Sequence, residues 1–561
     1  MSNDTKVAKF NKRLENLRSA RSDFMPWWGE LSDYHLAHRG KFLMGDSDKA
    51  LRRNTKQINN TSRLASRTLA SGMMAGITSP ARPWFKLATA DPKLKEHAAV
   101  KRWLHAVEVI MYRVYSQSNT YNSLHSLYAE IGVFGTGAMG VYQDFENVIR
   151  CKQYTVGSYM LGVNGIDRVD TMYREYQQTV GQLVKKFGID KVSDSVKQQW
   201  ENGNTESWID CVHAVEPNDD RDHMSPFAGD MPFRSVYYEK SKGNTEDGFL
   251  KESGFEDFPI MAPRWDVVGE GVYSSDCPGM VVLGDTKALQ LGEKRKYQAV
   301  DKVSNPPLLT SAGLKNKTKG QTPQPGEMIY GGSAGSDDTI SSIYGNYRPD
   351  INAIRDVNFE AEGRIKRGFY EDLFLMMINN NKRQPITATE VAEKQEEKLL
   401  MLGPVLERLH DELLDPLVDR TFNILQRAGI LPPPPQELQD SKLAIEYVSV
   451  LAQAQRMVAV SGLRQTVSFA AEVAQVWPEA RHKINATETV DAFSEAMGTD
   501  PNIIRSDDEV GEIMAGEAQA KQAAQESAQA VQQIETTKTA SEIDTGGENA
   551  VTEVMRQAGL K

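Results

Sequence analysis

The chain has 561 residues, of which 40% are hydrophobic and 25% are charged, and its formal net charge is −11. This length exceeds one ordinary domain, and the acidic balance argues against a protein that grips DNA over a broad basic surface. The most apolar run, Thr68–Ala81, is too short and too interrupted to cross a membrane, and Cys151, Cys211 and Cys277 are too far apart for a CxxC metal site.

The first half of the chain alternates between helical and strand-like patterns. Basic amphipathic helices are predicted within Lys6–Asp46, where we expect an aromatic cluster of Phe24, Trp27, Trp28 and Tyr34 to pack into a core. The remaining predicted helices are Ala99–Tyr115, Tyr121–Phe134, Gln178–Phe187 and Lys191–Gln199, and the strand-rich stretch is Val141–Val268, with hairpin pieces at Val148–Tyr154 and Ser235–Glu239. These patterns predict a mixed α/β body.

Two charged helices flank an irregular insertion in the centre of the chain. The first helix is predicted over Asp285–Ser304, because Asn305, Pro306 and Pro307 stop it. Pro, Gly and Ser then break any period, and short pieces such as Met328–Tyr330 favour edge strands. Helical spacing returns at Ile351, with the apolar stripe Ile354, Ala361, Ile365, Phe369, Leu373 and Met376. We expect the second helix to run back beside the first.

A polar loop and a long helix follow. The loop Asn379–Pro385 carries only positive charge, so it belongs in water or against an anion. Thr387–Glu390 fits a capping box, and the helix that it begins is predicted to continue to about Ala428. Pro404 and Pro416 are expected to kink that helix.

The C-terminal part begins with a stiff proline run, Leu431–Pro435. Helices are predicted at about Lys442–Ser461 and Arg464–Val476. From about Gly511 the chain is rich in Ala, Gln, Glu and Thr and has few bulky apolar residues, so it cannot bury enough surface to fold alone. We expect a flexible tail, or a helix that forms only beside neighbours.

Two segments resemble nucleotide-binding motifs. Gly135–Gly140 matches GxGxxG, but it follows a predicted helix and precedes a strand, the reverse of the order in dinucleotide sites. Gly279–Thr286 copies a phosphate-binding loop except that Asp285 stands where a Lys must neutralise phosphate. We interpret both segments as structural turns.

Other chemical motifs are equally weak. His35 and His38 lack a third ligand, and the pairs Asp337-Asp338 and Asp507-Asp508 sit in sequence typical of solvated loops. Gly72 and Gly76 have the GxxxG spacing, which here favours close packing of two helices in a globular protein. No combination of Ser, His and Asp is singled out by the sequence, so nothing argues for nucleophilic catalysis. We therefore predict no enzyme activity, no cofactor and no metal.

The chain resembles the portal, or head-to-tail connector, proteins of short-tailed double-stranded DNA bacteriophages. The resemblance rests on Asn59–Leu87, on Gly135–Ala138 and on the order helix, insertion, helix, basic loop, Thr-Ala-Thr-Glu, long helix. It implies an α+β, mostly helical fold assembled as a ring of about twelve copies. The implied domains are a wing (1–284), a stem (285–304 and 351–376), a clip (305–350), a tunnel loop (377–386), a long kinked wing helix (387–430), a crown (431–510) and a flexible tail (511–561).

The resemblance also implies a function. The ring would form a channel at one capsid vertex for packaging and ejection of double-stranded DNA, without sequence specificity. Its implied partners are the terminase large subunit, capsid and scaffolding proteins, tail adaptor or nozzle proteins and internal ejection proteins, but no membrane. The chain would assemble in the host cytoplasm and reside in the virion at the head-tail junction. Two alternatives stay open: a shell or tail assembly protein without a channel, and a packaging enzyme.

Candidate site residues follow from this reading. In one chain a basic loop is a solvated loop, but a ring repeats it into a positive collar that could contact phosphates. The tunnel-loop candidates are Asn379, Asn380, Asn381, Lys382 and Arg383. The stem candidates are Lys294, Arg295, Lys296, Arg364, Lys366 and Arg367, and the clip candidates for motor or tail docking are Lys315, Lys317, Lys319 and Tyr330.

Overall fold

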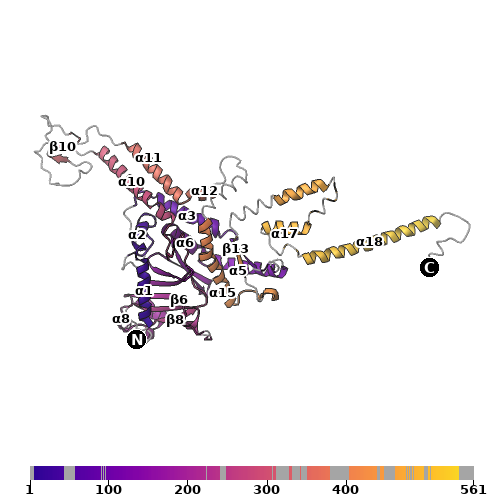
Figure 1. Ribbon diagram of the computed structural model, residues 1–561, viewed down its shortest axis with the longest axis horizontal. Coiled ribbons are helices and arrows are strands. Elements are labelled where there is room, and N and C mark those ends of the chain that lie inside the picture. The colour runs from indigo at the N-terminus through magenta and orange to yellow at the C-terminus, as the bar shows by residue number, and fades with distance from the viewer. Residues whose placement is uncertain are drawn as a thin grey trace. The chain divides into compact units, whose positions relative to one another are not determined.

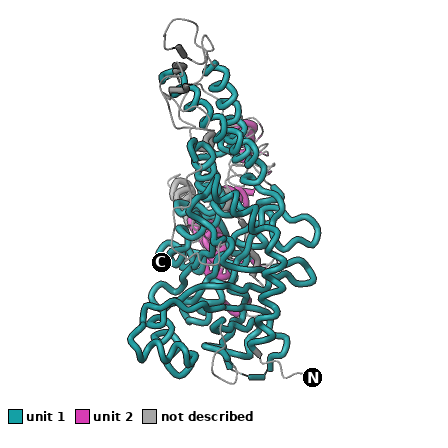
Figure 2. The backbone as a smooth tube through the Cα atoms, turned by 90° about the vertical axis from the view of Figure 1, so that its left-hand side faces the viewer, with its two compact units in different colours: residues 1–88, 106–433, 443–454 teal, residues 89–105, 434–442, 455–561 magenta. Residues whose placement is uncertain are grey.

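The computed structural model describes most of the chain. The described ranges are 6–42, 57–89, 97–222, 227–240, 248–305, 308–310, 328–330, 341–342, 350–378, 403–438, 443–447, 462–474, 485–497 and 507–541, with isolated positions between some of them. The chain divides into two compact units (Figure 2): unit 1 contains residues 1–88, 106–433 and 443–454, and unit 2 contains residues 89–105, 434–442 and 455–561. Helices and antiparallel sheets make up an α+β fold that is mostly helical.

A five-stranded antiparallel sheet forms one half of the body of unit 1. Its order is β4 (Tyr159–Val163), β5 (Val169–Thr179), β6 (Trp208–Pro217), β7 (Phe233–Glu239) and β8 (Lys251–Phe255). Helix α1 (Lys6–Ser22) covers one face, where Phe10 and Leu14 pack on Tyr173 and Tyr238. On the other face α7 (Val180–Phe187) and α8 (Asp194–Glu201) bury Leu183 and Val196 against part of the sheet. Successive side chains along a strand point to opposite faces, so the two faces of the sheet contribute to two separate hydrophobic cores.

A smaller sheet and several helices form the other half. The sheet order is β3 (Val148–Tyr154), β2 (Ala138–Asp144) and β9 (Ile260–Met261). The helices are α2 (Phe24–Tyr34), α3 (Thr61–Ile77), the part of α5 (Ala98–Gln117) from residue 106 onward, α6 (Thr120–Phe134) and α9 (Pro278–Val281). Trp28 is fully buried and packs edge-on against Tyr273, while Trp27 is partly exposed. The predicted core role is confirmed for Trp28.

Most helices and strands predicted for the first 284 residues are confirmed within a few residues. The three-residue 3₁₀ turns are Ile189–Lys191, Ala228–Asp230 and Gln436–Leu438. Among the described helices, none is long and apolar enough to cross a bilayer.

Two adjacent helices project from the body of unit 1 (Figure 1). They are α10 (Leu283–Ser304) and α11 (Ile351–Gly368), and they lie side by side. The chain between them contributes β10 (Leu308–Thr310), β11 (Met328–Tyr330) and β12 (Ser341–Ser342), which pair in the order β11, β10, β12. The predicted end of the first helix at Ser304 and the predicted edge strand are therefore confirmed.

The apolar stripe predicted a second helix that runs unbroken to Met376, and this prediction is wrong. The helix ends at Gly368, and α12 (Glu371–Ile378) starts after a turn in which Tyr370 has φ 55°. A left-handed tyrosine interrupts the helical hydrogen bonds. The break lets Phe369 and Phe374 both reach buried positions, so packing outweighs helical periodicity here.

The long helix is described from Gly403 onward. It consists of α14 (Gly403–Leu409), a π-helical turn (His410–Leu414) and α15 (Asp415–Arg427). The irregularity lies immediately before Pro416, which has no amide hydrogen to donate to the preceding turn. A π-helical turn thus precedes Pro416, where a kink was predicted, and Pro404 lies in the first turn of α14. The capping box Thr387–Glu390 lies outside the described residues.

The C-terminal predictions have mixed outcomes. The start of the helix predicted over Lys442–Ser461 is wrong, because β13 (Leu443–Tyr447) pairs with β1 (Phe85–Thr89) instead. Leu443, Ile445 and Tyr447 alternate with other residues at the period of a strand. In unit 2, residues 462–474 are helical as predicted, and α17 (Ala486–Met497) is a further helix.

The tail segment of unit 2 contains a long helix. It is α18 (Asp507–Ser541), which agrees with the helical alternative for this segment, and nearly all of its described side chains are exposed.

Candidate functional site

The interface between α10 and α11 contains a satisfied polar cluster. A Cβ on Gly292 would lie 2.1 Å from Oδ1 of Asn358, so the glycine allows close approach. Nδ2 of Asn358 donates to Oε1 of Glu293 at 2.8 Å, and Nζ of Lys296 lies 2.6 Å from Oε2 of Glu293. Buried polar groups that find partners in this way fix the register of two helices.

A second network ties the helix pair to the segment before α3. Oε1 of Gln290 accepts hydrogen bonds from the amides of Ile58 (2.7 Å) and Asn59 (2.8 Å), and its Nε2 donates to the carbonyl of Asn59 (2.8 Å). Nδ2 of Asn59 donates to Oε1 of Glu362 at 2.8 Å. Sequence reasoning missed this network. The signal that could have revealed this network is the presence of polar residues at helix positions that are buried in the structure.

The histidine pair does not form a metal site. His35 is fully buried, its Nδ1 is hydrogen-bonded to Oγ of Ser62, and its ring packs edge-on against Phe369. Burial lowers the pKa of His35 to about 3, which keeps the ring neutral. Burial and the nearby guanidinium groups of Arg63, Arg39 and Arg67 also lower the pKa of His38. Within the described residues, no three His, Cys, Asp or Glu side chains gather where they could hold a metal ion.

The glycine motifs are structural. Gly135 ends α6 with φ 78° and leads into β2, the helix-then-strand order expected from the sequence. Residues 279–286 fall almost wholly in α9 and α10, and a Cβ on Gly279 would lie 2.4 Å from the carbonyl oxygen of Val133. Oδ1 of Asp285 lies 2.9 Å from Nε of Arg364. The turn expected at Gly279–Thr286 is therefore wrong, because this segment is helical, and neither segment forms a strand-to-helix phosphate-binding loop.

Of the two glycines in the GxxxG spacing, only Gly72 is closely packed against another helix. A Cβ on Gly72 would lie 2.1 Å from Cγ of Phe374, whereas Gly76 faces open space. Close helix packing is thus confirmed at Gly72, where α3 meets α12. That contact lies a few residues before the predicted tunnel loop.

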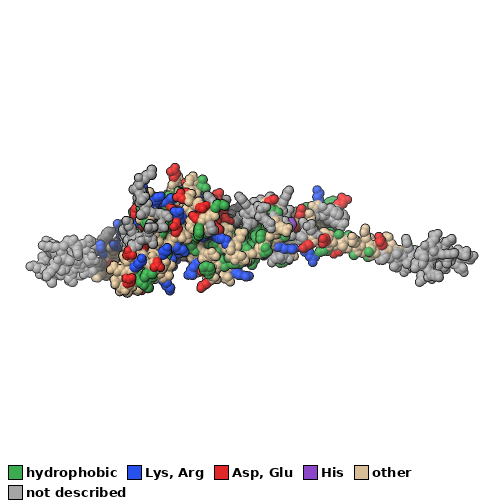
Figure 3. Space-filling view, turned by 90° about the horizontal axis from the view of Figure 1, so that it is seen from below, with side chains coloured by type: hydrophobic (Ala, Val, Ile, Leu, Met, Phe, Trp, Pro, Cys, Tyr) green, Lys and Arg blue, Asp and Glu red, His purple; other side chains and the backbone are tan. Residues whose placement is uncertain are grey.

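The basic candidates on α10 and α11 differ in their surroundings. Lys294, Arg295, Lys366 and Arg367 are exposed, whereas Lys296 and Arg364 are engaged by Glu293 and Asp285. Exposed acids, Asp301, Asp356 and Glu360, lie on the same helices. On the face shown in Figure 3, basic and acidic side chains are interspersed without a large basic patch. The described residues on this face therefore present no broad cationic surface.

The remaining candidates lie mostly outside the described residues. These are the tunnel-loop residues 379–383, the clip residues Lys315, Lys317 and Lys319, and the pair Asp337-Asp338. Tyr330 lies in β11, the edge strand of its small sheet. Asp507 and Asp508 begin α18.

The long helix is fixed to the body by two buried arginines. Nη2 of Arg264 lies 2.6 Å from Oε1 of Glu412, and the amide of Arg264 donates to Oε2 of the same carboxylate at 2.9 Å. Nε of Arg420 donates to the carbonyl of Val141 at 2.7 Å, and burial lowers the pKa of Arg420 to about 10. These charge-assisted bonds hold the helix against the small sheet.

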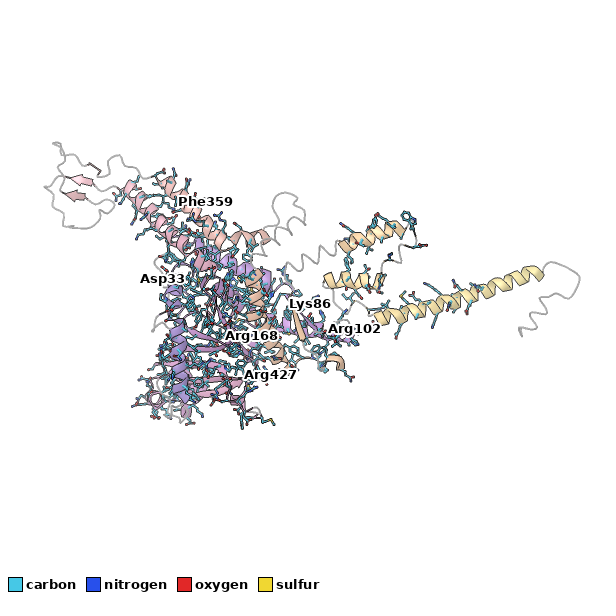
Figure 4. The ribbon with its side chains drawn as sticks, in the orientation of Figure 1. Asp33, Lys86, Arg102, Arg168, Phe359 and Arg427 are labelled. Atoms are coloured by element: carbon cyan, nitrogen blue, oxygen red, sulfur yellow. The ribbon has the colours of Figure 1, made fainter. Side chains whose placement is uncertain are left out.

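Large apolar side chains are exposed on the projecting helices. Phe359 on α11 is 75% exposed (Figure 4), and Val357 on the same helix is 63% exposed. The two flank buried Asn358, about 100° away on either side around the helix axis. On α10, Tyr297 and Val303 are also more than half exposed. Apolar groups therefore face solvent on both sides of α11.

Comparison with known proteins places the chain among phage proteins. The sequence model described as "Bacteriophage head to tail connecting protein" matches residues 7–504. The chain is 43% identical over 557 residues to the "Portal protein" of Salmonella phage epsilon15, with 99% of each chain covered. It is 41% identical over 556 residues to the "Probable portal protein" of Bordetella phage BPP-1, again over 99% of each chain.

Proposed function

Because the chain belongs to the family of bacteriophage head-to-tail connecting proteins, we propose that it is a portal protein: a ring at one capsid vertex through which double-stranded DNA enters and leaves the head. The observation that carries this proposal is the near-complete, 43% identical match to a portal protein. Identity of this extent over 99% of both chains leaves little room for a different architecture in either protein.

Exposed apolar groups on the projecting helices support ring assembly. A closed ring is built from head-to-tail contacts, in which each copy presents two different surfaces to its two neighbours. Val357 and Phe359 lie on opposite flanks of α11 and are both largely exposed. A single apolar flank would fit a two-fold dimer better. We propose a ring of about twelve copies in which these flanks meet.

The elements of the chain can be assigned to the parts of a portal. We assign α10, α11 and residues 371–376 of α12 to the stem, residues 305–350 to the clip and residues 377–386, which begin with the last turn of α12, to the tunnel loop. The body before α10 and the helix that reaches Arg427 would form the wing, residues 431–510 the crown, and 511–561 a tail whose order depends on neighbours. Two features support the stem: the α10–α11 pair projects from the body, and its buried polar clusters keep it rigid.

The net charge of the chain favours a channel that DNA passes through over a protein that binds DNA tightly. The chain is acidic overall, with a net charge of −11. A weakly repulsive wall lets a polyanion slide, while repeated basic positions steady it. We propose that Lys382, Arg383 and the exposed stem residues Lys294, Arg295, Lys366 and Arg367 supply those positions. Such contacts are made with phosphates and are independent of base sequence.

The packaging motor would be a separate protein. The chain's closest approach to a nucleotide site, residues 279–286, is mostly helical and has Asp285 in place of the phosphate-binding lysine. We propose that the chain is no enzyme and that the terminase large subunit docks on the clip, followed by tail proteins after packaging. The proposed location is the virion head-tail junction.

Deletion of the clip tests the docking proposal. Residues 306–349 would be replaced by a short Gly/Ser linker between α10 and α11. We expect the variant to keep its helical content and its ring, but to lose co-sedimentation with the terminase large subunit of the same phage. A variant that folds and still binds the motor would overturn the clip assignment. An unfolded product would equally count against it, because the insertion would then be part of the body.

A further inference from the structure

A row of cationic and aromatic side chains crosses the large sheet on the face opposite α1. The strand register aligns Arg174 on β5 with His213 on β6, His213 with Tyr237 on β7, and Tyr237 with Lys251 on β8. Residues directly opposite one another in antiparallel strands share one face. The neighbouring row on the other face, which includes Tyr173, belongs to the core under α1.

The guanidinium at one end of this row has no anionic partner among the described residues. Arg174 is only 9% exposed, and its Cζ lies 4.2 Å from the ring centroid of Tyr176 and 5.0 Å from that of Tyr154. The rings cover the guanidinium, but aromatic rings offer no oxygen acceptor to its N–H groups. Oη of Tyr176 is also buried without a hydrogen-bond partner. A buried arginine is normally paired with a carboxylate.

Further cations surround Arg174. Nζ of Lys186, on α7, lies 4.8 Å from the ring centroid of Tyr237, and the charges of Arg174 and Lys251 help to lower the pKa of Lys186, after the larger effect of burial. Arg174 and Lys186 also help to lower the pKa of buried His213, again after burial. The nearby buried carboxylate of Glu239 is occupied by the amide and hydroxyl of Ser193. The described part of this face therefore gathers three cations, Arg174, Lys186 and Lys251, beside the buried carboxylate of Glu239.

We infer that Arg174, Lys186 and Lys251 form a docking site for an acidic segment of a partner protein, with one carboxylate reaching Arg174. A carboxylate matches the planar fork of a guanidinium and forms two parallel hydrogen bonds with it. Lys186 and Lys251 are exposed, so they would contact flanking acids, while the methylene groups of the segment pack on Tyr237. This site is separate from the proposed channel function and does not depend on it.

The burial of Arg174 favours a peptide over duplex DNA. A flexible aspartate or glutamate side chain can reach a guanidinium that is 9% exposed. A phosphate on a duplex is held on the surface of a wide, stiff rod, so it cannot be lowered between the two tyrosine rings that cover the guanidinium. An extended acidic segment does not meet this obstacle.

Binding of a labelled peptide tests the inference. The full-length chain would be titrated into fluorescein-labelled hexaglutamate and, separately, into a labelled short DNA duplex, with fluorescence anisotropy as the readout. Loss of a charge-assisted pair should weaken hexaglutamate binding about tenfold or more in Arg174→Gln. Lys186→Gln and Lys251→Gln should each weaken it about threefold. The matched control is Lys185→Gln, which removes an equal, exposed charge from the next residue and should bind like the unaltered chain.

Three results would overturn the inference. The first is absence of hexaglutamate binding by the unaltered chain, and the second is an equal loss of binding in Lys185→Gln. The third is tighter binding of the duplex with the same dependence on Arg174, which would identify a nucleic-acid site. Because Arg174 is buried, its variant may unfold, and the combined Lys186→Gln, Lys251→Gln variant at exposed positions then decides: unchanged binding overturns the inference.

Discussion

Replacement of Phe359 by serine should impair ring assembly. Phe359 is 75% exposed on α11, the helix that buries Ala361 and Ile365 on another face. An exposed phenylalanine on a projecting helix costs a lone chain nothing in folding, but it can be buried by a neighbouring copy. If a neighbour covers it, its truncation weakens every contact around the ring.

The size of the effect follows from the exposed area. A phenylalanine buries about 200 Å² in a core or interface, and 75% of it is exposed in the single chain, so about 150 Å² is available to a neighbour. At about 25 cal/mol per Å² this corresponds to about 4 kcal/mol for each contact. Each 1.4 kcal/mol is about tenfold in an equilibrium constant, so each contact should weaken by several hundredfold.

Native mass spectrometry and sedimentation velocity, over a range of protein concentrations, would measure assembly of the variant. Glu360→Ser is the matched control, because Glu360 is the next residue on the same helix and carries an exposed polar side chain. Circular dichroism should show that both variants are folded. We expect rings for Glu360→Ser and smaller species for Phe359→Ser. Rings of folded Phe359→Ser at the same concentration as the unaltered chain would refute the assigned interface.

Three other perturbations have defined outcomes. Replacing Lys382 and Arg383 by alanine should leave ring assembly intact and reduce the amount of DNA packaged per head, measured by nuclease protection, whereas loss of the ring would show that the loop is structural. Glu412→Ala should lower the free energy of unfolding by about 3–5 kcal/mol, because it leaves the guanidinium of Arg264 buried and unpaired; a urea titration measures this, and the combined Arg264→Met, Glu412→Leu variant should recover much of the loss. The pKa of His35, about 3 in the folded chain, lies below the ordinary value of 6.5, so its contribution to stability is fully present above pH 6.5 and is lost as the pH falls toward 3, by about 1.4 kcal/mol per pH unit. Urea titrations of His35→Gln should show a shallower decline over that window than the unaltered chain, and an identical decline would contradict the assignment.

Local signals in the sequence were enough to predict the projecting helix pair. Two consecutive prolines after Asn305 stop α10 whatever surrounds them, since proline can neither donate a backbone hydrogen bond nor fit inside a helix. The spacing of Ala361 and Ile365 likewise places one face of α11 against α10. These are properties of neighbouring residues, and tertiary contacts did not override them.

Elements that depend on distant contacts were not predictable. The turn at Tyr370 exists because Phe374 packs against Gly72, about three hundred residues earlier in the chain. The strand Leu443–Tyr447 forms because β1 offers it a partner. Gln290 has the polar character of an ordinary helix residue, yet its side chain donates a hydrogen bond to the backbone carbonyl of Asn59. The alternation of Leu443, Ile445 and Tyr447 and the polar side chain of Gln290 are local signals, but the partner that each one meets is not encoded locally.

The candidate site also has a part that the sequence predicted and a part that it did not. Its basic residues were identifiable from charge and loop composition, but their effect depends on repetition around an axis, which a single sequence does not encode. The cationic row through Arg174 was not identified from sequence at all, because its members come from β5, β6, β7 and β8 and meet only through strand register.

The most direct test of the central claim is electron microscopy of the purified full-length chain, with class averages and native mass measured on the same sample. The portal proposal predicts a ring of about twelve copies with an axial hole wide enough for duplex DNA, roughly 20 Å or more. Assemblies without an axial hole would contradict it and favour a shell or tail protein.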